Sequence, residues 1–255
     1  MVRRVTPRLE VFRDLADASD ALAHRVVANA GAAVRERGRF LWVISGGRTP
    51  LGLYERLAGR LGRRLPWEAT EVYFADERCV PPSRPDSNFG SARSTFLDRV
   101  PIARRRVHRL RGEVRPPSAE AVRYARLIGR LGGPEPRFDM VLLGIGPDGH
   151  TASLFPDAPA TRERRRPVVA VRRAGQPPYV PRLTLTPRAL SSARDVCFLV
   201  AGADKADALR STLAAPPAGD TAYPASLIQP SSPATWFVDR AASGGSRAPR
   251  RGRGA

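Results

Sequence analysis

A histidine and an aspartate stand two residues apart in the glycine-rich segment GIGPDGH at 144–150. Histidine titrates near neutral pH and can take a proton from water, and a nearby carboxylate can orient its ring. His150 is therefore a candidate general base, with Asp148 as its partner. A histidine that caps a turn is the alternative on this local pattern. The glycines resemble a weak GxGxxG motif, but Pro147 and Asp148 put a rigid, acidic turn where a pyrophosphate would lie, which argues against a dinucleotide.

A second glycine-rich segment, SGGRTP at 45–50, follows the apolar run FLWVI. Glycines let the backbone approach a ligand closely, and the start of a helix favours negative charge. Ser45, Gly46 and Gly47 are therefore candidates for a phosphate cradle. For a bare Gly–Gly pair, an ordinary strand-to-helix turn is the simpler interpretation, and the spacing does not match a P-loop.

Three cations are candidates for holding an anion. Lys205 is the only lysine among 43 basic residues. A compact ammonium can enter a tight phosphate or carboxylate site that a guanidinium cannot, although chance survival of one lysine explains it equally well. Arg78 and Arg182 stand at the ends of predicted strands, where a guanidinium can make bidentate contacts to an anion.

Other chemistries have little support in the sequence. The remaining histidines, His24 and His108, are scattered, and no pair of ligands has metal-site spacing, so we expect no metal and no cofactor. Cys79 and Cys197 do not form a disulfide framework and are expected to be reduced thiols. Ser153 lacks the GxSxG environment of a serine hydrolase.

The composition describes a basic chain of 255 residues, 42% of them hydrophobic, which is enough to bury a large core. A net charge of +19 suggests a nucleic-acid binder. However, most of this excess is arginine in 101–137, 160–173 and from 241 onward, outside the motifs described above. No recognition helix or aromatic RNA-binding motif accompanies it, so we expect no nucleic-acid partner.

The sequence also bears on location. No apolar run approaches the ~20 residues of a membrane span, and the N-terminus lacks an apolar signal core. We expect a cytoplasmic protein without a membrane partner. The oligomeric state stays open, with a monomer favoured.

Apolar runs alternate with helical patterns along the chain, which predicts crossover units and a mainly parallel sheet flanked by helices in a three-layer α/β fold. We expect one domain over 1–240 and a disordered Arg/Gly-rich tail over 241–255. Thr49 is predicted to cap the second helix and Pro50 to open it. The expected strands are 40–44, 71–75, 138–144, 168–171, 195–201 and 235–238, and the expected helices are 16–38, 49–60, 86–97, 118–131, 203–213 and a short one from Thr151. Because loops after parallel strands gather at one edge of a sheet, the segments at 45–50, 76–78 and 144–150 are expected to converge.

These segments, in this order, resemble the 6-phosphogluconolactonase family over roughly residues 10–240. The matching pieces are SGGRTP (45–50), VYFADERCVPPSRPDSN (72–88), FDMVLLGIGPDGHTASLFP (138–156), PRLTLT (181–186) and FLVAGADKADAL (198–209). The related glucosamine-6-phosphate deaminases share the glycine loop and a DGH element but normally continue differently, so TASLFP at 151–156 favours the lactonase.

The resemblance implies hydrolysis of 6-phospho-D-glucono-1,5-lactone in the pentose phosphate pathway, with a sugar phosphate lactone as the small-molecule partner. It implies that His150 activates a water molecule and that Asp148 orients the ring of His150. The remaining implied contacts to phosphate or sugar come from Ser45, Gly46, Gly47, Arg78, Arg182 and Lys205.

The chain departs from the family pattern beside Arg182. Gln176 stands where the family often has lysine, and residues 179–181 resemble a small insertion, so the placement of Arg182 is the least secure of these assignments. A deaminase-like enzyme is the alternative function, followed by a basic nucleic-acid-binding protein.

Overall fold

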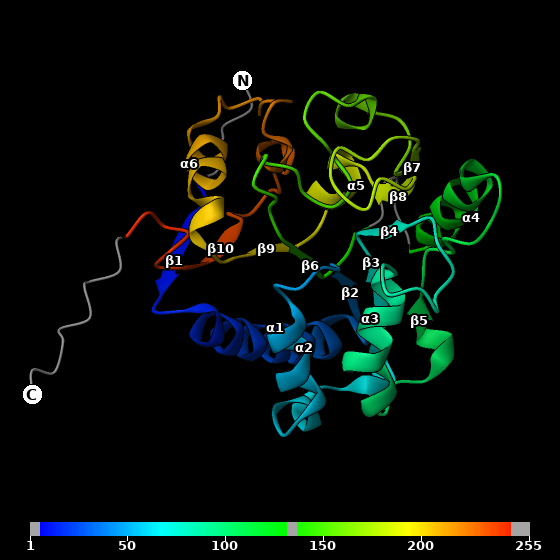
Figure 1. Cartoon of the computed structure of the whole chain (residues 1–255). Helices are drawn as coiled ribbons and strands as arrows, with labels where there is room; N and C mark the ends of the chain where they lie inside the picture. The colour runs from blue at the N-terminus through cyan, green and yellow to red at the C-terminus, as the bar shows by residue number, and fades with distance from the viewer. Residues whose placement is uncertain (1–5, 132–136, 246–255) are drawn as a thin grey trace, which may run out of the picture.

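The structure is a computed structural model that describes residues 6–131 and 137–245 of the chain (Figure 1). Its strands are β1 (Arg8–Phe12), β2 (Phe40–Ile44), β3 (Thr70–Phe74), β4 (Asp76–Arg78), β5 (Val107–His108), β6 (Met140–Leu143), β7 (Val168–Val171), β8 (Arg182–Leu185), β9 (Asp195–Val200) and β10 (Thr235–Asp239). Its α-helices are α1 (Leu15–Arg37), α2 (Leu51–Ala58), α3 (Asn88–Thr95), α4 (Pro117–Gly129), α5 (Pro187–Ser191) and α6 (Ala206–Ala214).

A parallel sheet forms the centre of the described part of the chain, with the strand order β1-β10-β9-β6-β2-β3-β5. Each pair of neighbours in it is parallel. In Figure 1, α1, α2 and α3 lie on one side of this sheet, whereas α5 and α6 lie on the other. The predicted three-layer α/β architecture is confirmed.

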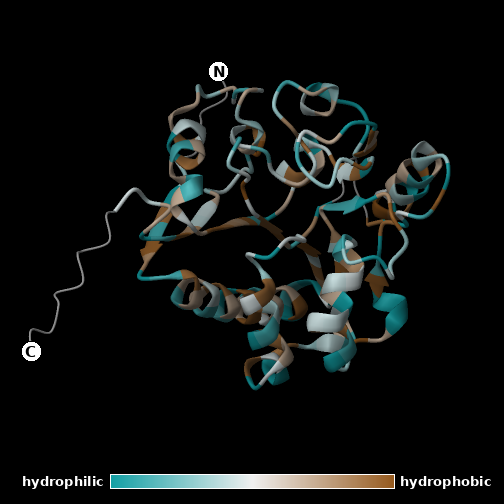
Figure 2. Cartoon of the chain, in the orientation of Figure 1, coloured by the Kyte–Doolittle hydropathy of each residue, from teal (hydrophilic) through white to brown (hydrophobic). Residues whose placement is uncertain are grey.

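The central strands are apolar because both of their faces are covered. All five residues of β2 (FLWVI) are buried. Trp42 of this strand lies 6.4 Å from the ring of Tyr54 and 6.1 Å from that of Phe96, so α2 and the end of α3 pack over it. Figure 2 shows apolar residues concentrated along these strands, with hydrophilic residues more frequent on the outer helices.

The helix predicted at 16–38 is α1, and local chemistry sets both of its ends. The Asp14 carboxylate accepts a hydrogen bond from the Asp17 N–H and caps the start. Gly38 ends the helix in the left-handed conformation, with a φ of 71°. At α2 the prediction about the cap was wrong: Pro50 is the N-cap residue, and no side chain, Thr49 included, makes the capping bond.

A small antiparallel sheet, β4-β8-β7, lies above the carboxyl edge of the central sheet (Figure 1). The sequence did not predict this separate sheet. Only Ala75 separates β3 from β4, and its backbone joins the two sheets. Its N–H donates to the Ile44 carbonyl of β2 over 2.9 Å, and its carbonyl accepts from the Leu185 N–H of β8 over 2.8 Å.

Two further predictions differ from the structure. The segment from Thr151 forms a turn closed by a bridge between Thr151 and Leu154, and it is not a helix. Ala152 in this turn has a φ of 49°, which is incompatible with a helix. The predicted tail begins in an ordered turn, because Ala242 is buried and its N–H donates to Asp239. Residues 246–255 of that tail lie outside the described residues.

Candidate active site

The loops after β2, β6 and β9 meet at the carboxyl edge of the central sheet and line a cavity of about 540 Å³. Strand β3, the next strand of this sheet along the chain, pairs with one edge of β2, whereas β6 pairs with the opposite edge of β2. The loops after β2 and β6 therefore flank a point where the strand order reverses, which is where open α/β sheets bind ligands. Of the predicted site residues, all but Asp148 line this cavity: Ser45, Gly46, Gly47, Arg78, His150, Arg182 and Lys205.

His150 and Asp148 form a hydrogen-bonded pair at this edge. The imidazole Nδ1 lies 2.5 Å from Asp148 Oδ1, and the backbone N–H of His150 donates to the same oxygen over 3.2 Å. Burial by itself would raise the pKa of Asp148, but its hydrogen bond and charge interaction with His150 lower that pKa to about 2. Asp148 is thus a carboxylate at neutral pH, and no hydrogen bond between described residues occupies His150 Nε2.

Gly146 makes room for this pair. A Cβ atom on Gly146 would lie 2.0 Å from Nδ1 of His150 and 2.6 Å from Oδ1 of Asp148. The turn is closed by hydrogen bonds from the Gly146 N–H to the His150 carbonyl and from the Gly149 N–H to the Gly146 carbonyl. Gly149 has a φ of 81°. Gly146 and Gly149 therefore allow the tight turn that brings His150 and Asp148 into contact.

The glycine loop after β2 is fixed from two sides. The Ser45 hydroxyl donates to the Leu142 carbonyl of β6 over 2.7 Å, and the Tyr54 hydroxyl of α2 donates to the Ser45 carbonyl over 2.5 Å. Gly47 has a φ of 89°, a conformation that favours glycine. The Ser45 hydroxyl already donates its proton to Leu142. The backbone N–H groups of Gly46 and Gly47 are therefore the donors in this loop that could bind an anion.

Arg78 and Arg182 form a pair of cations on one wall of the cavity. They are register partners across β4 and β8. Within the described residues neither makes an ion pair with a carboxylate. The Arg78 guanidinium donates to the Asp86 carbonyl over 2.6 Å. Burial and the charge of Arg78 lower the pKa of Arg182. Two neighbouring guanidinium groups without carboxylate partners favour a bound anion.

The segment before β8 holds Arg182 in place. Its guanidinium donates to the carbonyls of Gln176 (3.2 Å), Pro178 (2.7 Å) and Val180 (3.2 Å). The Arg182 side chain is almost completely buried, and of the three carbonyls that hold it only that of Val180 belongs to the residues that resemble an insertion.

Lys205 lies at the end of the 3₁₀ turn Ala203–Lys205, which leads into α6. Its Nζ lies 2.9 Å from Asp204 Oδ2, and both residues line the cavity. The structure therefore places the single lysine with the two arginines around one space.

Three polar residues, Asp76, Asn88 and Ser153, make contacts at the site that the sequence analysis did not predict. Asp76, on the cavity wall, accepts hydrogen bonds from the Ser153 hydroxyl over 2.7 Å and from the Asn88 amide over 3.0 Å. All three side chains are buried. Asp76 and Asn88 stand in the polar segments DER and DSN, so nothing local in the sequence marked them as buried, and only Ser153 has largely apolar neighbours.

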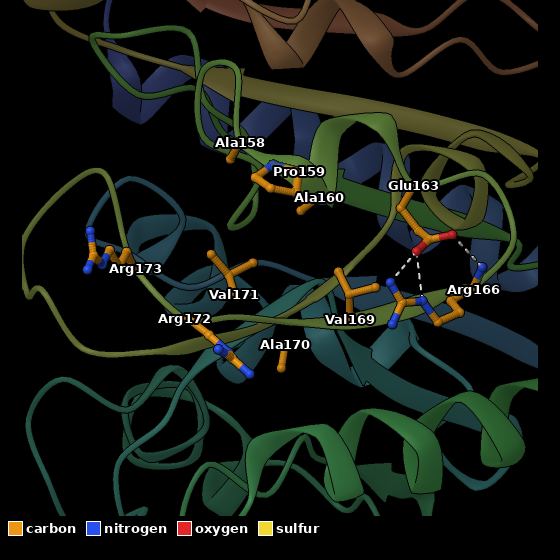
Figure 3. Close-up of a pocket in the computed structure, with 10 residues that line it drawn as sticks. All are labelled: Ala158, Pro159, Ala160, Glu163, Arg166, Val169, Ala170, Val171, Arg172 and Arg173. Atoms are coloured by element: carbon orange, nitrogen blue, oxygen red, sulfur yellow. Dashed lines mark hydrogen bonds and ion pairs between the residues drawn. The ribbon is translucent and has the colours of Figure 1, made fainter.

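A second cavity, of about 580 Å³, contains none of the predicted site residues (Figure 3). Its wall is mainly apolar, with Val169 and Val171 of β7 facing Pro159 in the close-up. Glu163 and Arg166 form an ion pair at its side. It has neither a histidine nor an unpaired carboxylate, so it offers no comparable chemistry.

His108 and the two cysteines, also considered in the sequence analysis, are occupied in packing or in hydrogen bonds away from the cavity. The His108 ring lies 2.9 Å from a Glu71 oxygen and stacks on Tyr73. Cys79 and Cys197 are buried and unpaired. Burial raises the pKa of the Cys79 thiol to about 11, even though Arg78 precedes it. Among the described residues, no group of three or more His, Cys, Asp or Glu side chains is arranged to hold a metal ion, and no helix is long and apolar enough to cross a membrane.

Comparison with known proteins agrees with this geometry. Residues 13–237 match the family of glucosamine-6-phosphate isomerases/6-phosphogluconolactonase. The chain belongs to this family. Among curated relatives, the 6-phosphogluconolactonase of a Nostoc species is 40% identical over 82% of this chain and 86% of that protein. The family resemblance drawn from the motifs is confirmed.

Solved structures of family members have the same fold. The 6-phosphogluconolactonase of Thermotoga maritima is 30% identical, with a TM-score of 0.79 over 92% of this chain and 100% of the other. A monomeric glucosamine-6-phosphate deaminase also has a TM-score of 0.79, over 94% of this chain and 100% of the other, at 21% identity. The fold therefore accommodates both kinds of family member, and only the site residues can separate the two activities.

Proposed function

We propose that this protein hydrolyses 6-phospho-D-glucono-1,5-lactone to 6-phospho-D-gluconate, a step of the oxidative pentose phosphate pathway. One observation carries the proposal: a histidine held by a carboxylate shares a cavity with two arginines that form no ion pair with a carboxylate of the described residues. Lactonases among the relatives, at up to 41% identity, support the same reaction.

In this mechanism His150 is the general base. Its Nε2 takes a proton from a water molecule as the water oxygen bonds to the lactone carbonyl carbon. Asp148, bonded at Nδ1, orients the ring and stabilises the imidazolium. The tetrahedral intermediate then collapses, the bond from this carbon to the ring oxygen breaks, and the ring oxygen receives the proton from His150. The products are a free hydroxyl and a carboxylic acid, which ionises in water.

The cations and the glycine loop bind the charged groups of the substrate. Arg78, Arg182 and Lys205 hold the phosphate or the developing carboxylate, and the backbone of Gly46 and Gly47 completes the phosphate cradle. Positive charge in a partly enclosed cavity also stabilises the oxyanion of the intermediate. A lactone is an activated ester, so a base and this electrostatic stabilisation suffice for the reaction, and no cofactor is required.

A monomer is the proposed working unit. A sugar phosphate substrate of central metabolism supports a cytoplasmic location. In this proposal the arginines outside the site bind no specific partner, and their positive charge contributes only to electrostatic attraction of the dianionic substrate.

The alternative is deamination of an amino-sugar phosphate, because a deaminase has the same fold. The TASLFP segment argues against it, because the related deaminases normally continue differently after the DGH element. In this structure Ser153 of that segment donates a hydrogen bond to Asp76. Binding of nucleic acid would appear as a tight interaction with a steep salt dependence.

The test is a lactone-decay assay on purified protein. Because the lactone also hydrolyses spontaneously, the His150→Ala variant and a protein-free sample provide the baseline. Ammonia release from glucosamine 6-phosphate is measured in parallel. Accelerated lactone loss without ammonia supports the proposal, whereas ammonia release without accelerated lactone loss rejects it in favour of deamination.

A further inference from the structure

Gln176 connects the histidine–carboxylate pair to the arginine wall of the cavity. Its side-chain Nε2 donates to Asp148 Oδ2 over 3.0 Å, and its backbone carbonyl accepts from Arg182 over 3.2 Å. The residue lines the cavity and lies in the segment that folds around Arg182. One residue thus contacts the partner of the base and an anion-binding candidate.

The two oxygens of Asp148 have separate donors. His150 takes Oδ1 through both its ring and its backbone N–H, and Gln176 takes Oδ2. A carboxylate held at both oxygens cannot rotate about its terminal bond without losing a hydrogen bond. Its orientation in turn fixes the imidazole plane, because Nδ1 bonds to it over 2.5 Å.

We propose that Gln176 is a positioning residue: its side-chain amide fixes Asp148 and, through Asp148, the ring of His150. This inference rests on the proposed role of His150 as the base. The amide suits the task because it donates one hydrogen bond and adds no charge beside the carboxylate. Its backbone carbonyl holds Arg182 separately, so a change of the side chain separates the two functions.

A charge introduced at position 176 acts on a defined set of neighbours. The Phe155 ring, 5.1 Å from the His150 ring, is uncharged. Tyr223 packs against Gly149. The charged and titratable groups that face the pair across the cavity come from the glycine loop, β4, β8 and the turn before α6: Arg48, Asp76, Arg78, Arg182, Asp204 and Lys205.

The first experiment separates kcat from KM. Gln176→Met retains the length of the side chain and removes the donor. We expect kcat to fall on the order of 10-fold, because a base held in a looser geometry reaches the reactive arrangement less often. KM should stay within about threefold, since the backbone carbonyl that holds Arg182 remains. Tyr179→Ala is the matched control, because Tyr179 lies in the same segment and is 75% exposed. Unchanged kcat in Gln176→Met would overturn the proposal.

The second experiment needs no substrate. Imidazole titration by NMR, assigned with His150→Ala, follows His150 in the wild type, Gln176→Lys and Gln176→Glu. An ammonium beside Asp148 disfavours the imidazolium and moves its titration to lower pH, whereas a second carboxylate moves it to higher pH, each by about one pH unit. Opposite shifts show that the side chain at position 176 lies against Asp148, as the proposal requires, so coincident titrations would reject the proposal. If the wild type fails to hydrolyse the lactone while these shifts are present, the proposed function fails and the positioning contact stands.

Discussion

Arg78 and Arg182 are register partners across two antiparallel strands, and neither forms a direct ion pair with a carboxylate among the described residues. Each guanidinium is held by backbone carbonyls instead. Such carbonyls orient a cation without cancelling its charge, so the pair presents a fixed positive wall to the cavity. Binding of an anion relieves the repulsion between the two groups.

This arrangement predicts stabilisation by inorganic phosphate. A ligand present at 100 times its Kd stabilises the folded state by about 2.7 kcal/mol. We expect phosphate to raise the Tm of the wild type and to have a clearly smaller effect on Arg78→Met. Thermal unfolding in phosphate and in chloride at matched ionic strength checks this. An equal rise in both proteins would remove Arg78 from the anion site.

His150→Ala should lower kcat on the order of 10²–10⁴-fold, which is the usual range for loss of a general base. His24→Ala is the control, because His24 lies on an exposed surface of α1. Single-turnover lactone decay, corrected for the spontaneous reaction, measures the effect. Near wild-type turnover in His150→Ala would contradict its role.

Lys205→Ala should act mainly on KM. An ammonium on a phosphate oxygen contributes about 1.5–3 kcal/mol as a hydrogen bond to a charged group, which corresponds to roughly a 10- to 100-fold rise in KM. Lys205→Arg should restore binding only in part, since the larger guanidinium enters the same space less well. Steady-state kinetics distinguishes these cases, and an unchanged KM in Lys205→Ala would leave this lysine without a role in binding.

Gly46→Ala should destabilise the protein because the new Cβ would lie 1.9 Å from Asn88 Oδ1. Overpacking of this kind costs about 1–3 kcal/mol. Gly129→Ala in α4 is the control, since nothing lies within 4 Å of a Cβ at that position. Urea unfolding of both variants measures the difference. Equal stability of the two would show that Asn88 moves aside without cost.

Glu77 makes stability depend on pH. Burial raises its pKa from the ordinary value of 4.5 to about 7, although backbone N–H groups of Phe89, Asn88 and Arg78 partly oppose the rise. A carboxyl with a raised pKa holds its proton in the folded state while the unfolded chain releases it. Stability therefore falls as pH rises from about 4.5 to about 7, by on the order of 3 kcal/mol. Glu77→Gln removes this titration. Urea unfolding at pH 5 and pH 7.5 should show a smaller fall in Glu77→Gln than in the wild type, and parallel curves would contradict the assignment.

Much of the central fold was predictable because its strands are buried on both faces. Continuous apolar runs such as 40–44 and 196–200 are typical of strands that are buried on both faces, and parallel strands send their loops to one edge of the sheet. That rule predicted that the segments at 45–50, 76–78 and 144–150 would converge, and His150, Gly46 and Arg78 from these segments line one cavity. The small sheet could not be predicted from the sequence because β4 has only three residues and is separated from β3 by Ala75 alone.

The polar contacts of the site could not be predicted from spacing. Ser153 and Asp76 are 77 residues apart, and Gln176 and Asp148 are 28 apart, so their meeting depends on how the small sheet packs. The turn after His150 was misjudged because Ala152 adopts a left-handed conformation that composition does not reveal. Tertiary contacts, including the Ser153–Asp76 bond, hold it there.

The backbone of Ala75 has a consequence for how this site can change over time. Alternate residues of a strand point to opposite sides, and β4 sends Asp76 and Arg78 to the cavity while Glu77 points away from it toward the start of α3. Insertion or deletion of one residue at Ala75 would turn Asp76 and Arg78 away from the cavity and would put the Glu77 carboxyl group on the cavity wall beside Arg182. A change in chain length between the two sheets is therefore expected to destroy the cavity wall, whereas a change in the length of an exposed loop leaves the register of β4 intact.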